Sequence, residues 1–241
     1  MLETRQRIPE VTKNLLIINI LAFIANMVTP VDLNSLLGLY YFASPEFQPY
    51  QLVTHMFMHG SIMHIFFNMF ALWMFGTPLE QVWGPKRFLI FYFVTALGAA
   101  FLHEFVNYLQ IESVMNGMSP ESIRIVMAQG AESIRNGQNF IDPAMAKLNL
   151  LMNIPVVGAS GAIFGLLLGF GMLFPNTRLM LLFPPIPIKA KYFVIGYGLI
   201  ELFSGVLNRP GDNVAHFAHV GGMLFGFILI KIWQKRRDRF Y

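Results

Sequence analysis

Six apolar stretches, separated by short polar or charged connections, dominate this sequence. Each is close to the ~20 residues that a helix needs to cross a bilayer. The composition agrees, because 55% of the 241 residues are hydrophobic and only 12% are charged, whereas soluble domains carry about 25% charged residues. We therefore predict an all-α polytopic membrane protein, one domain over residues 1–241. Its six transmembrane helices are expected at residues 14–30, 61–79, 88–108, 155–174, 188–206 and 213–233.

The basic residues indicate the orientation of these helices. An even number of spans places both termini on one side, and most Lys and Arg residues of the connections and tails fall on that side. By the positive-inside rule, both termini are expected in the cytoplasm, with residues 29–60 and 109–153 facing outward. Only four basic residues fall on the outward side: Arg124, Arg135, Lys147 and Arg209.

Composition also excludes several classes of protein. The chain has no cysteine, so disulfides, thiolate catalysis and Cys-ligated metals are excluded. Its net charge of +4 does not indicate a nucleic-acid partner, because the basic residues lie between apolar runs and form no patch with aromatic residues. The first apolar run precedes no signal-cleavage pattern, so we interpret it as an uncleaved helix.

Two connections are long. Residues 29–60 contain three prolines but also apolar and aromatic residues, which indicates a loop folded back onto the membrane surface. Residues 109–153 contain two helix-start patterns, Ser119-Pro120 and Asp142-Pro143, each an N-cap residue followed by proline. A stripe at Ile123, Met127 and Ile134 leaves two possibilities for this insertion: a helix on the membrane surface, or an exposed helical hairpin.

The predicted topology places four polar side chains at a similar depth. Ser160 is expected about five residues into the fourth span, roughly 7–8 Å below its outer end at ~1.5 Å per residue. His219 lies about six residues into the sixth span, and His64 and Asn68 lie in the outer half of the second. Polar groups inside a membrane are costly and usually face a protein interior or a water cavity.

Small residues indicate which of these spans approach closely. They recur every four positions on two spans: Gly161, Gly165 and Gly169 on the fourth, and Ala218, Gly222 and Gly226 on the sixth. Since Ser160 adjoins one stripe and His219 adjoins the other, a hydrogen bond between them is plausible. The alternative is that the glycines only pack helices and the polar residues only link them.

Three motifs resemble those of the rhomboid intramembrane serine proteases, in the order and on the helices of that family. They are His59-Gly-Ser-Ile-Met-His64-Ile-Phe-Phe-Asn68, then Gly158-Ala-Ser160-Gly161, then Ala218-His219-Val-Gly-Gly222-Met-Leu-Phe-Gly226. The resemblance covers nearly the whole chain apart from residues 109–153. Each motif alone is weak, but their combination at one membrane depth is specific.

The resemblance implies a role for each residue. Ser160 would be the nucleophile and His219 its general base, a dyad that lacks the orienting acid of soluble serine proteases. The oxyanion would be stabilised by the side chains of His64 and Asn68 and by the Ser160 backbone N–H. Supporting roles would fall to five further residues: Gly158, Gly161, Phe164, His59 and Gly222.

Some positions differ from the family pattern or lie outside it. Phe164 stands where many members carry tyrosine, and Tyr50-Gln51 stands where many carry Trp-Arg. Glu80 matches a glutamate of the family, but it lies near the cytoplasmic end and is assigned no catalytic role. His216 could tune His219 or bind solvent, although packing is its expected role. His55 is expected in a loop, and three other residues at the membrane interface: His103, Glu104 and Glu201.

The resemblance implies hydrolysis of single-span membrane proteins near the outer membrane face, without cofactor or metal. The expected location is the inner membrane of a bacterium, and the expected partners are such substrates and the lipid bilayer. Two other functions stay open. One is a rhomboid-like protein that binds membrane clients without cleaving them. The other is a metal-binding or transport protein using the histidines, although no H-E-x-x-H spacing occurs.

Overall fold

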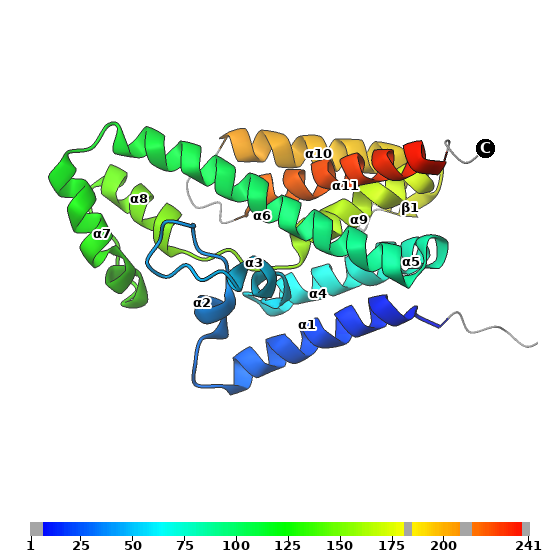
Figure 1. Cartoon of the computed structure of the whole chain (residues 1–241), viewed down its shortest axis with the longest axis horizontal. Coiled ribbons are helices and arrows are strands. Elements are labelled where there is room, and N and C mark those ends of the chain that lie inside the picture. The colour runs from blue at the N-terminus through cyan, green and yellow to red at the C-terminus, as the bar shows by residue number, and fades with distance from the viewer. Residues whose placement is uncertain (1–6, 181–184, 208–213, 238–241) are drawn as a thin grey trace, which may run out of the picture.

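The computed structural model is an antiparallel helical bundle (Figure 1). It describes residues 7–180, 185–207 and 214–237. Five of its helical segments are long and apolar enough to cross a membrane, and a sixth apolar helix is shorter. The five are α1 (Glu10–Val28), the continuous helix Ile62–Trp83, α6 (Pro85–Met115), α10 (Ala190–Leu207) and α11 (His216–Arg237); the shorter one is α9 (Ser160–Leu173).

The helix Ile62–Trp83 has three parts: α4 (Ile62–Ala71), a π-helical turn η2 (Leu72–Gly76) and α5 (Thr77–Trp83). Two short strands, β1 (Arg178–Met180) and β2 (Pro187–Lys189), form an antiparallel pair between α9 and α10. The sequence analysis did not predict this pair. The start of α1 and the end of α11 lie at the same end of the bundle as β1 (Figure 1).

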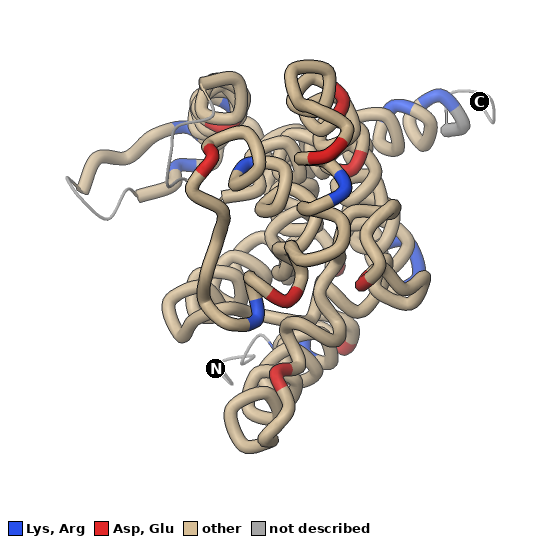
Figure 2. The backbone as a smooth tube through the Cα atoms, turned by 90° about the vertical axis from the view of Figure 1, so that its left-hand side faces the viewer, with Lys and Arg blue, Asp and Glu red and all other residues tan. Residues whose placement is uncertain are grey.

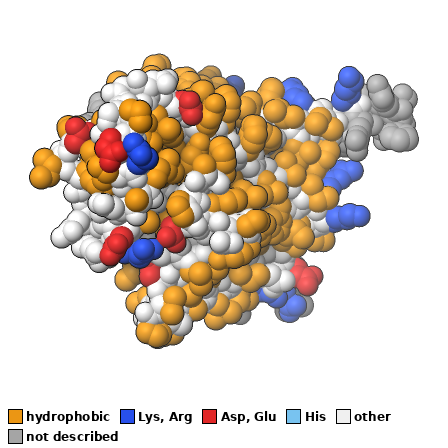
Figure 3. Space-filling model, turned by 60° about the vertical axis from the view of Figure 1, so that its left-hand side comes forward, with side chains coloured by type: hydrophobic (Ala, Val, Ile, Leu, Met, Phe, Trp, Pro, Cys, Tyr) orange, Lys and Arg blue, Asp and Glu red, His pale blue; other side chains and the backbone are white. Residues whose placement is uncertain are grey.

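The exterior is largely apolar. Figure 3 shows hydrophobic side chains over the middle of one face, with charged side chains towards both of its ends. Most of the backbone carries neither acidic nor basic side chains (Figure 2). Large exposed hydrophobic residues occur on every long helix, among them Leu21, Phe66, Phe101, Ile200 and Phe227. A soluble monomer rarely exposes so much apolar surface, so these faces suit contact with lipid.

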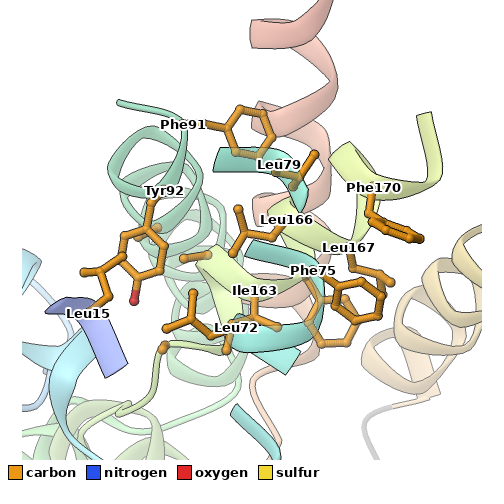
Figure 4. Packing of buried hydrophobic residues seen from close by; sticks show 14 of the residues in the cluster. Leu15, Leu72, Phe75, Leu79, Phe91, Tyr92, Ile163, Leu166, Leu167 and Phe170 are labelled. Atoms are coloured by element: carbon orange, nitrogen blue, oxygen red, sulfur yellow. The ribbon is translucent and has the colours of Figure 1, made fainter. Parts of the chain in front are cut away.

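Helix α9 is the centre of the core. Ten of its 14 residues are buried, and it packs against α4–α5, α6, α10 and α11. Because it is surrounded by protein, it need not be as long as the lipid-facing helices. Figure 4 shows its apolar side chains against those of α1, α4–α5 and α6. The labelled residues are Ile163, Leu166, Leu167 and Phe170 of α9, with Leu15, Leu72, Phe75, Leu79, Phe91 and Tyr92.

The boundary of α9 corrects one expectation. Ser160 is the first residue of α9 rather than the fifth or sixth. The preceding segment is extended because Val156 exchanges two backbone hydrogen bonds with Leu39 of the first long connection, at 2.9 and 2.8 Å. Gly158, with φ of +128°, then turns the chain into the helix. Ser160 therefore lies at the N-terminal end of α9, partly exposed and held by a loop, rather than further along the helix.

The first long connection is itself ordered. It contains α2 (Leu33–Leu37), α3 (Gln51–Thr54) and a 3₁₀ turn, η1 (His55–Phe57). Gln51 is buried, and its amide accepts from the backbone N–H groups of Tyr40 and Gln48 while donating to the carbonyls of Leu36 and Glu46. A single side chain thus ties together residues 36–51 of the loop.

The insertion forms two helices, as the N-cap patterns predicted. Ser119 caps α7 (Pro120–Arg135) and Asp142 caps α8 (Pro143–Asn153). The third span is longer than expected, because α6 continues to Met115. The hairpin has a small core of its own, which also includes one residue of the first connection: Tyr41, Ile111, Val126, Leu148 and Met152. The apolar stripe predicted on α7 faces this core only in part, because Ile123 packs against the core whereas Met127 is exposed.

Glu80 lies at the opposite end of the bundle from Ser160. Its carboxylate accepts hydrogen bonds from the N–H groups of Val11 and Thr12 and from the Thr12 hydroxyl. An acidic side chain at a helix N-terminus satisfies free N–H groups and complements the helix dipole. Glu80 therefore links α5 to α1, which agrees with its assignment to no catalytic role.

Candidate active site

Ser160 and His219 meet where α9 and α11 begin. The Ser160 Oγ lies 2.8 Å from the His219 Nε2, which is hydrogen-bond distance. His219 is the fourth residue of α11 and is buried, whereas Ser160 is partly exposed. A serine hydroxyl bonded to a neutral imidazole nitrogen is the arrangement of an activated nucleophile.

Two close backbone contacts explain why this pair can form. A Cβ on Gly222 would lie 1.9 Å from the Gly161 carbonyl oxygen, and one on Gly226 would lie 3.5 Å from the Gly165 Cα. The predicted small-residue stripes therefore face each other. Helix α6 contributes a third surface of this kind, because a Cβ on Gly161 would lie 2.5 Å from the Ala99 Cβ. The sequence analysis did not assign this role to α6.

Phe164 fixes one face of the histidine. Its ring is stacked on that of His219, with centroids 4.1 Å apart and 9° between the planes. Phe164 is one turn after Ser160, so the same helix supplies the nucleophile and the surface on which the base lies. Stacked aromatic pairs stabilise each other by about 0.5–1.5 kcal/mol.

His64 and Asn68 point at the turn before Ser160. A Cβ on Gly158 would lie 2.7 Å from the His64 Nε2 and 3.7 Å from the Asn68 Nδ2. The Asn68 Nδ2 is buried and has no hydrogen-bond partner among the described residues. An unused buried donor is uncommon and calls for an explanation. Beside a nucleophile, a donor free to bind a new negative charge is one explanation.

The two other histidines near this turn, His55 and His59, contact residues of the site. His59 is buried, and its ring contacts that of His64 edge-on at 5.0 Å between centroids. Burial, with a further contribution from nearby His64, lowers the pKa of His59 to about 4. His55, also buried, accepts the Gly158 N–H through its carbonyl at 2.9 Å, and burial lowers its pKa. Both rings are therefore neutral at pH 7 and contribute shape rather than charge.

The sequence predicted a serine–histidine pair without an acid, and in the structure a carboxylate lies beside His219. Glu201, expected at the membrane interface, is buried, and its Oε2 lies 2.8 Å from the His219 Nδ1. The same oxygen lies 2.6 Å from the Nδ1 of His216. Glutamate in an apolar helix was a signal in the sequence, because such a residue needs a partner. Spacing alone could not identify that partner, since Glu201 and His219 belong to different helices.

Glu104 and His103 do not join the site. The Glu104 carboxylate accepts the Phe42 N–H at 2.9 Å, and the His103 Nε2 lies 3.1 Å from the Asn107 side-chain amide. Glu104 therefore links α6 to the first connection, and His103 forms a bond within α6.

Comparison with known proteins identifies the family. The Rhomboid domain matches residues 46–236 of the chain. The chain belongs to the rhomboid family. This rhomboid is 31% identical over 192 residues to RHOMBOID-like protein 12, mitochondrial, of Arabidopsis thaliana, which covers 78% of this chain and 48% of that protein. It is 22% identical over 235 residues to the rhomboid protease GlpG of Yersinia pestis, covering 97% of this chain and 66% of GlpG.

A third relative is Rhomboid protein 1, mitochondrial, of Saccharomyces cerevisiae, 25% identical over 197 residues, covering 78% of this chain and 44% of that protein. The chain thus spans about half the length of the first relatives it matches. Family membership and the apolar helices confirm the predicted helical membrane fold and identify an integral membrane protein. The names of these relatives do not support a bacterial location in particular, because two of them are mitochondrial.

Proposed function

We propose that this rhomboid is an intramembrane serine endopeptidase. Ser160 is its nucleophile, His219 its general base, and His64, Asn68 and the Ser160 N–H its oxyanion donors. The observation that carries the proposal is the 2.8 Å contact between the Ser160 Oγ and the His219 Nε2 on a helical membrane scaffold. The protease activity named for the GlpG relative supports the same reaction.

The reaction follows from the geometry. As the Ser160 Oγ attacks the carbonyl carbon of the scissile peptide bond, its proton passes to the His219 Nε2. His219 then protonates the leaving amine, and the C–N bond breaks to give an acyl-enzyme. Water attacks this ester and loses its proton to His219. As the bond between the acyl carbon and the Ser160 Oγ breaks, His219 returns this proton to Oγ, which releases the second product and restores free Ser160.

The negative charge of each tetrahedral intermediate needs donors. Ser160 begins α9, where N–H groups have no partner within the helix. The side chains of His64 and Asn68 converge on the turn at Gly158, two residues earlier. Each such donor typically stabilises the transition state by about 3–4 kcal/mol.

The proposed substrates are single-span membrane proteins, cut near the outer face of the membrane. Ser160 is the first residue of α9, and His64 and Asn68 lie in the first two turns of α4. Both helices begin away from the end of the bundle that holds the start of α1 and the end of α11 (Figure 1). If both of these ends face the cytoplasm, as the charge distribution predicts, the site faces outward. The membrane in which the protein resides is left open between a bacterial inner membrane and an organellar membrane.

Cleavage of a membrane-helix substrate by the purified chain in liposomes tests the proposal. The expected result is cleavage by wild type and none by Ser160→Ala or His219→Ala. Ser133→Ala is the matched control, because among the described residues the Ser133 hydroxyl bonds the Gln129 carbonyl of its own helix α7, and its loss should leave the rate unchanged. Retained cleavage by Ser160→Ala would overturn the mechanism. Binding of the substrate without cleavage by wild type would favour a non-proteolytic client-binding protein.

A further inference from the structure

Glu201 is a carboxylate within an apolar helix, and it has no role in the reaction as described above. It lies in α10, and only 5% of its surface is exposed. An ionisable group in such a helix is costly unless it faces a partner. Its partners are two histidines of α11, His216 and His219, and one of them is the proposed general base.

The bonds form a continuous chain from the nucleophile. The Ser160 Oγ lies 2.8 Å from the His219 Nε2, and the His219 Nδ1 lies 2.8 Å from the Glu201 Oε2. To accept the serine proton, neutral His219 must have a free Nε2 and therefore carry its proton on Nδ1. Glu201 is the acceptor that the described residues offer to that Nδ1–H.

His216 gives the Glu201 carboxylate a second hydrogen-bond partner. The Nδ1 atoms of His216 and His219 both lie within 2.8 Å of the same oxygen, Oε2. When both Nδ1 atoms carry a hydrogen, Oε2 accepts two N–H groups, an arrangement that suits an ionised carboxylate. A carboxylate beside His219 would also stabilise the imidazolium that forms when Ser160 loses its proton.

We propose that Glu201 is a positioning residue that completes a Ser160–His219–Glu201 triad across three helices. Its carboxylate holds the Nδ1–H tautomer of His219 and fixes the ring plane, while Phe164 supports the ring face. His216 in turn donates to the same oxygen and orients the carboxylate. This inference rests on the proposed protease function, which it extends.

Two other uses of the same contacts give different results when tested. Glu201 could serve only to link α10 with α11. Alternatively, Glu201, His216 and His219 offer three ligand atoms within 4.8 Å of one another, and could hold a divalent cation. The direct contacts of 2.6 and 2.8 Å are hydrogen-bond distances, which favours the triad over an ion placed between these atoms.

The test compares Glu201→Gln with wild type, using kcat and KM for a membrane-helix substrate and the rate of Ser160 labelling by a fluorophosphonate. The Gln side chain has the same shape but no charge. We expect kcat and labelling to fall by at least about 10-fold with KM within about two-fold; in a soluble triad, the corresponding change costs about 10⁴-fold. An unchanged kcat in a folded Gln variant would overturn the proposal.

Glu80→Gln is the matched control for a general loss of stability. Glu80 is also a buried glutamate with three hydrogen bonds. The side chain of its neighbour Leu79 would lie 3.4 Å from a Cβ added at Gly169, which is nine residues beyond Ser160 and so about 13 Å along α9. Glu80→Gln should lower thermal stability but not the kcat of the folded protein. Any activity that Glu80→Gln loses should match the fraction of that variant that is unfolded. If the loss in Glu201→Gln also only matches its unfolded fraction, Glu201 is a structural link and the proposal fails.

Glu201→Asp separates charge from length. It keeps the charge but shortens the side chain by one carbon, so a positioning carboxylate predicts that kcat is higher for Asp than for Gln. A link that depends on length predicts the reverse order, which would contradict the proposal. If the Gln variant does not fold, Glu201→Asp is compared with Glu80→Asp. A kcat below that of wild type is then expected for Glu201→Asp alone, and an unchanged kcat overturns the proposal.

Chelation removes the remaining alternative. Treatment of wild type with EDTA should leave kcat unchanged, and a fall to the level of Glu201→Gln would assign these residues to a metal ion instead. Failure of the proposed function itself looks different. In that case wild type does not cleave, or Ser160→Ala still does, and the triad fails with it. If wild type cleaves through Ser160 and Glu201→Gln equals it, only the role of Glu201 fails.

Discussion

Gly222→Ala tests whether close contact of α9 and α11 assembles the site. The added Cβ would lie 1.9 Å from the Gly161 carbonyl oxygen, whereas ordinary contacts begin at 3.4 Å. The obstacle is backbone on both sides, so a side-chain rotation cannot relieve it. The helices must therefore separate by about 1.5 Å at this point, and such overpacking typically costs about 1–3 kcal/mol of stability.

The same separation acts on the catalytic pair, because Gly161 adjoins Ser160 and Gly222 lies one turn after His219. The Oγ–Nε2 distance of 2.8 Å needs only ~1 Å of extension to exceed hydrogen-bond range. A misplacement of this size can cost about 100-fold in rate. We therefore expect kcat of Gly222→Ala to fall about 100-fold, a larger effect than its loss of stability explains.

The assay is substrate cleavage in liposomes, with unfolding by SDS measured on the same preparations. Gly196→Ala is the control, because nothing lies within 4 Å of a Cβ at that position of α10. Alanine there should keep the wild-type rate and gain about 0.5–1 kcal/mol of helix stability. A Gly222→Ala variant with kcat within two-fold of wild type would refute the claim that this contact sets the geometry of the site.

Three further predictions concern the surroundings of the catalytic pair. In Gly158→Ala, alanine must adopt an unfavourable φ of +128°, and its Cβ would lie 2.7 Å from the His64 Nε2. Cleavage should therefore fall by at least about 100-fold, as it does when an oxyanion donor is lost. Wild-type kinetics in this variant would argue against oxyanion binding at this turn. Phe164→Leu removes the ring stacked on His219 and should slow cleavage about two- to ten-fold. Phe164→Tyr keeps an aromatic ring in the stack and should keep the wild-type rate. Equal cleavage rates for the two variants would exclude a role for stacking. His59 has a pKa of about 4 when folded against 6.5 when unfolded, so between these values the unfolded chain binds the extra proton. The stability that His59 contributes is thus present above pH 6.5 and is lost towards pH 4, an effect of about 3 kcal/mol. Resistance to SDS should therefore fall as the pH is lowered from 6.5 to 4, and this fall should be smaller in His59→Gln. An identical pH dependence in the variant and in wild type would contradict this role of His59.

The helical membrane fold was predictable because it depends on local properties of the chain. Apolar length and the proline and N-cap signals depend on neighbouring residues, which is why Ser119 and Asp142 identified the starts of α7 and α8. The start of α9 was not predictable, because the apolar run continues through Val156 and Val157. Pairing of Val156 with Leu39 holds this segment extended, and that partner is more than 100 residues away.

The catalytic pair was predictable only in part. The small-residue stripes that include Gly161 and Gly222 indicated which helices approach, and the family resemblance implied the roles. The carboxylate beside His219 was not predicted, because Glu201 lies in α10 and hydrogen bonds across to α11, and no periodicity relates two different helices. Depth was the better guide, since Glu201 and His219 were both expected toward the outer ends of their helices.

The central claim is that Ser160 is a nucleophile activated by His219. The most direct measurement is labelling of the folded protein in liposomes with a fluorophosphonate, with the modified residue mapped by mass spectrometry. The account predicts one labelled serine, Ser160, in wild type, and loss of labelling in both Ser160→Ala and His219→Ala. Wild-type labelling at a different serine, or undiminished labelling of Ser160 in His219→Ala, would contradict it.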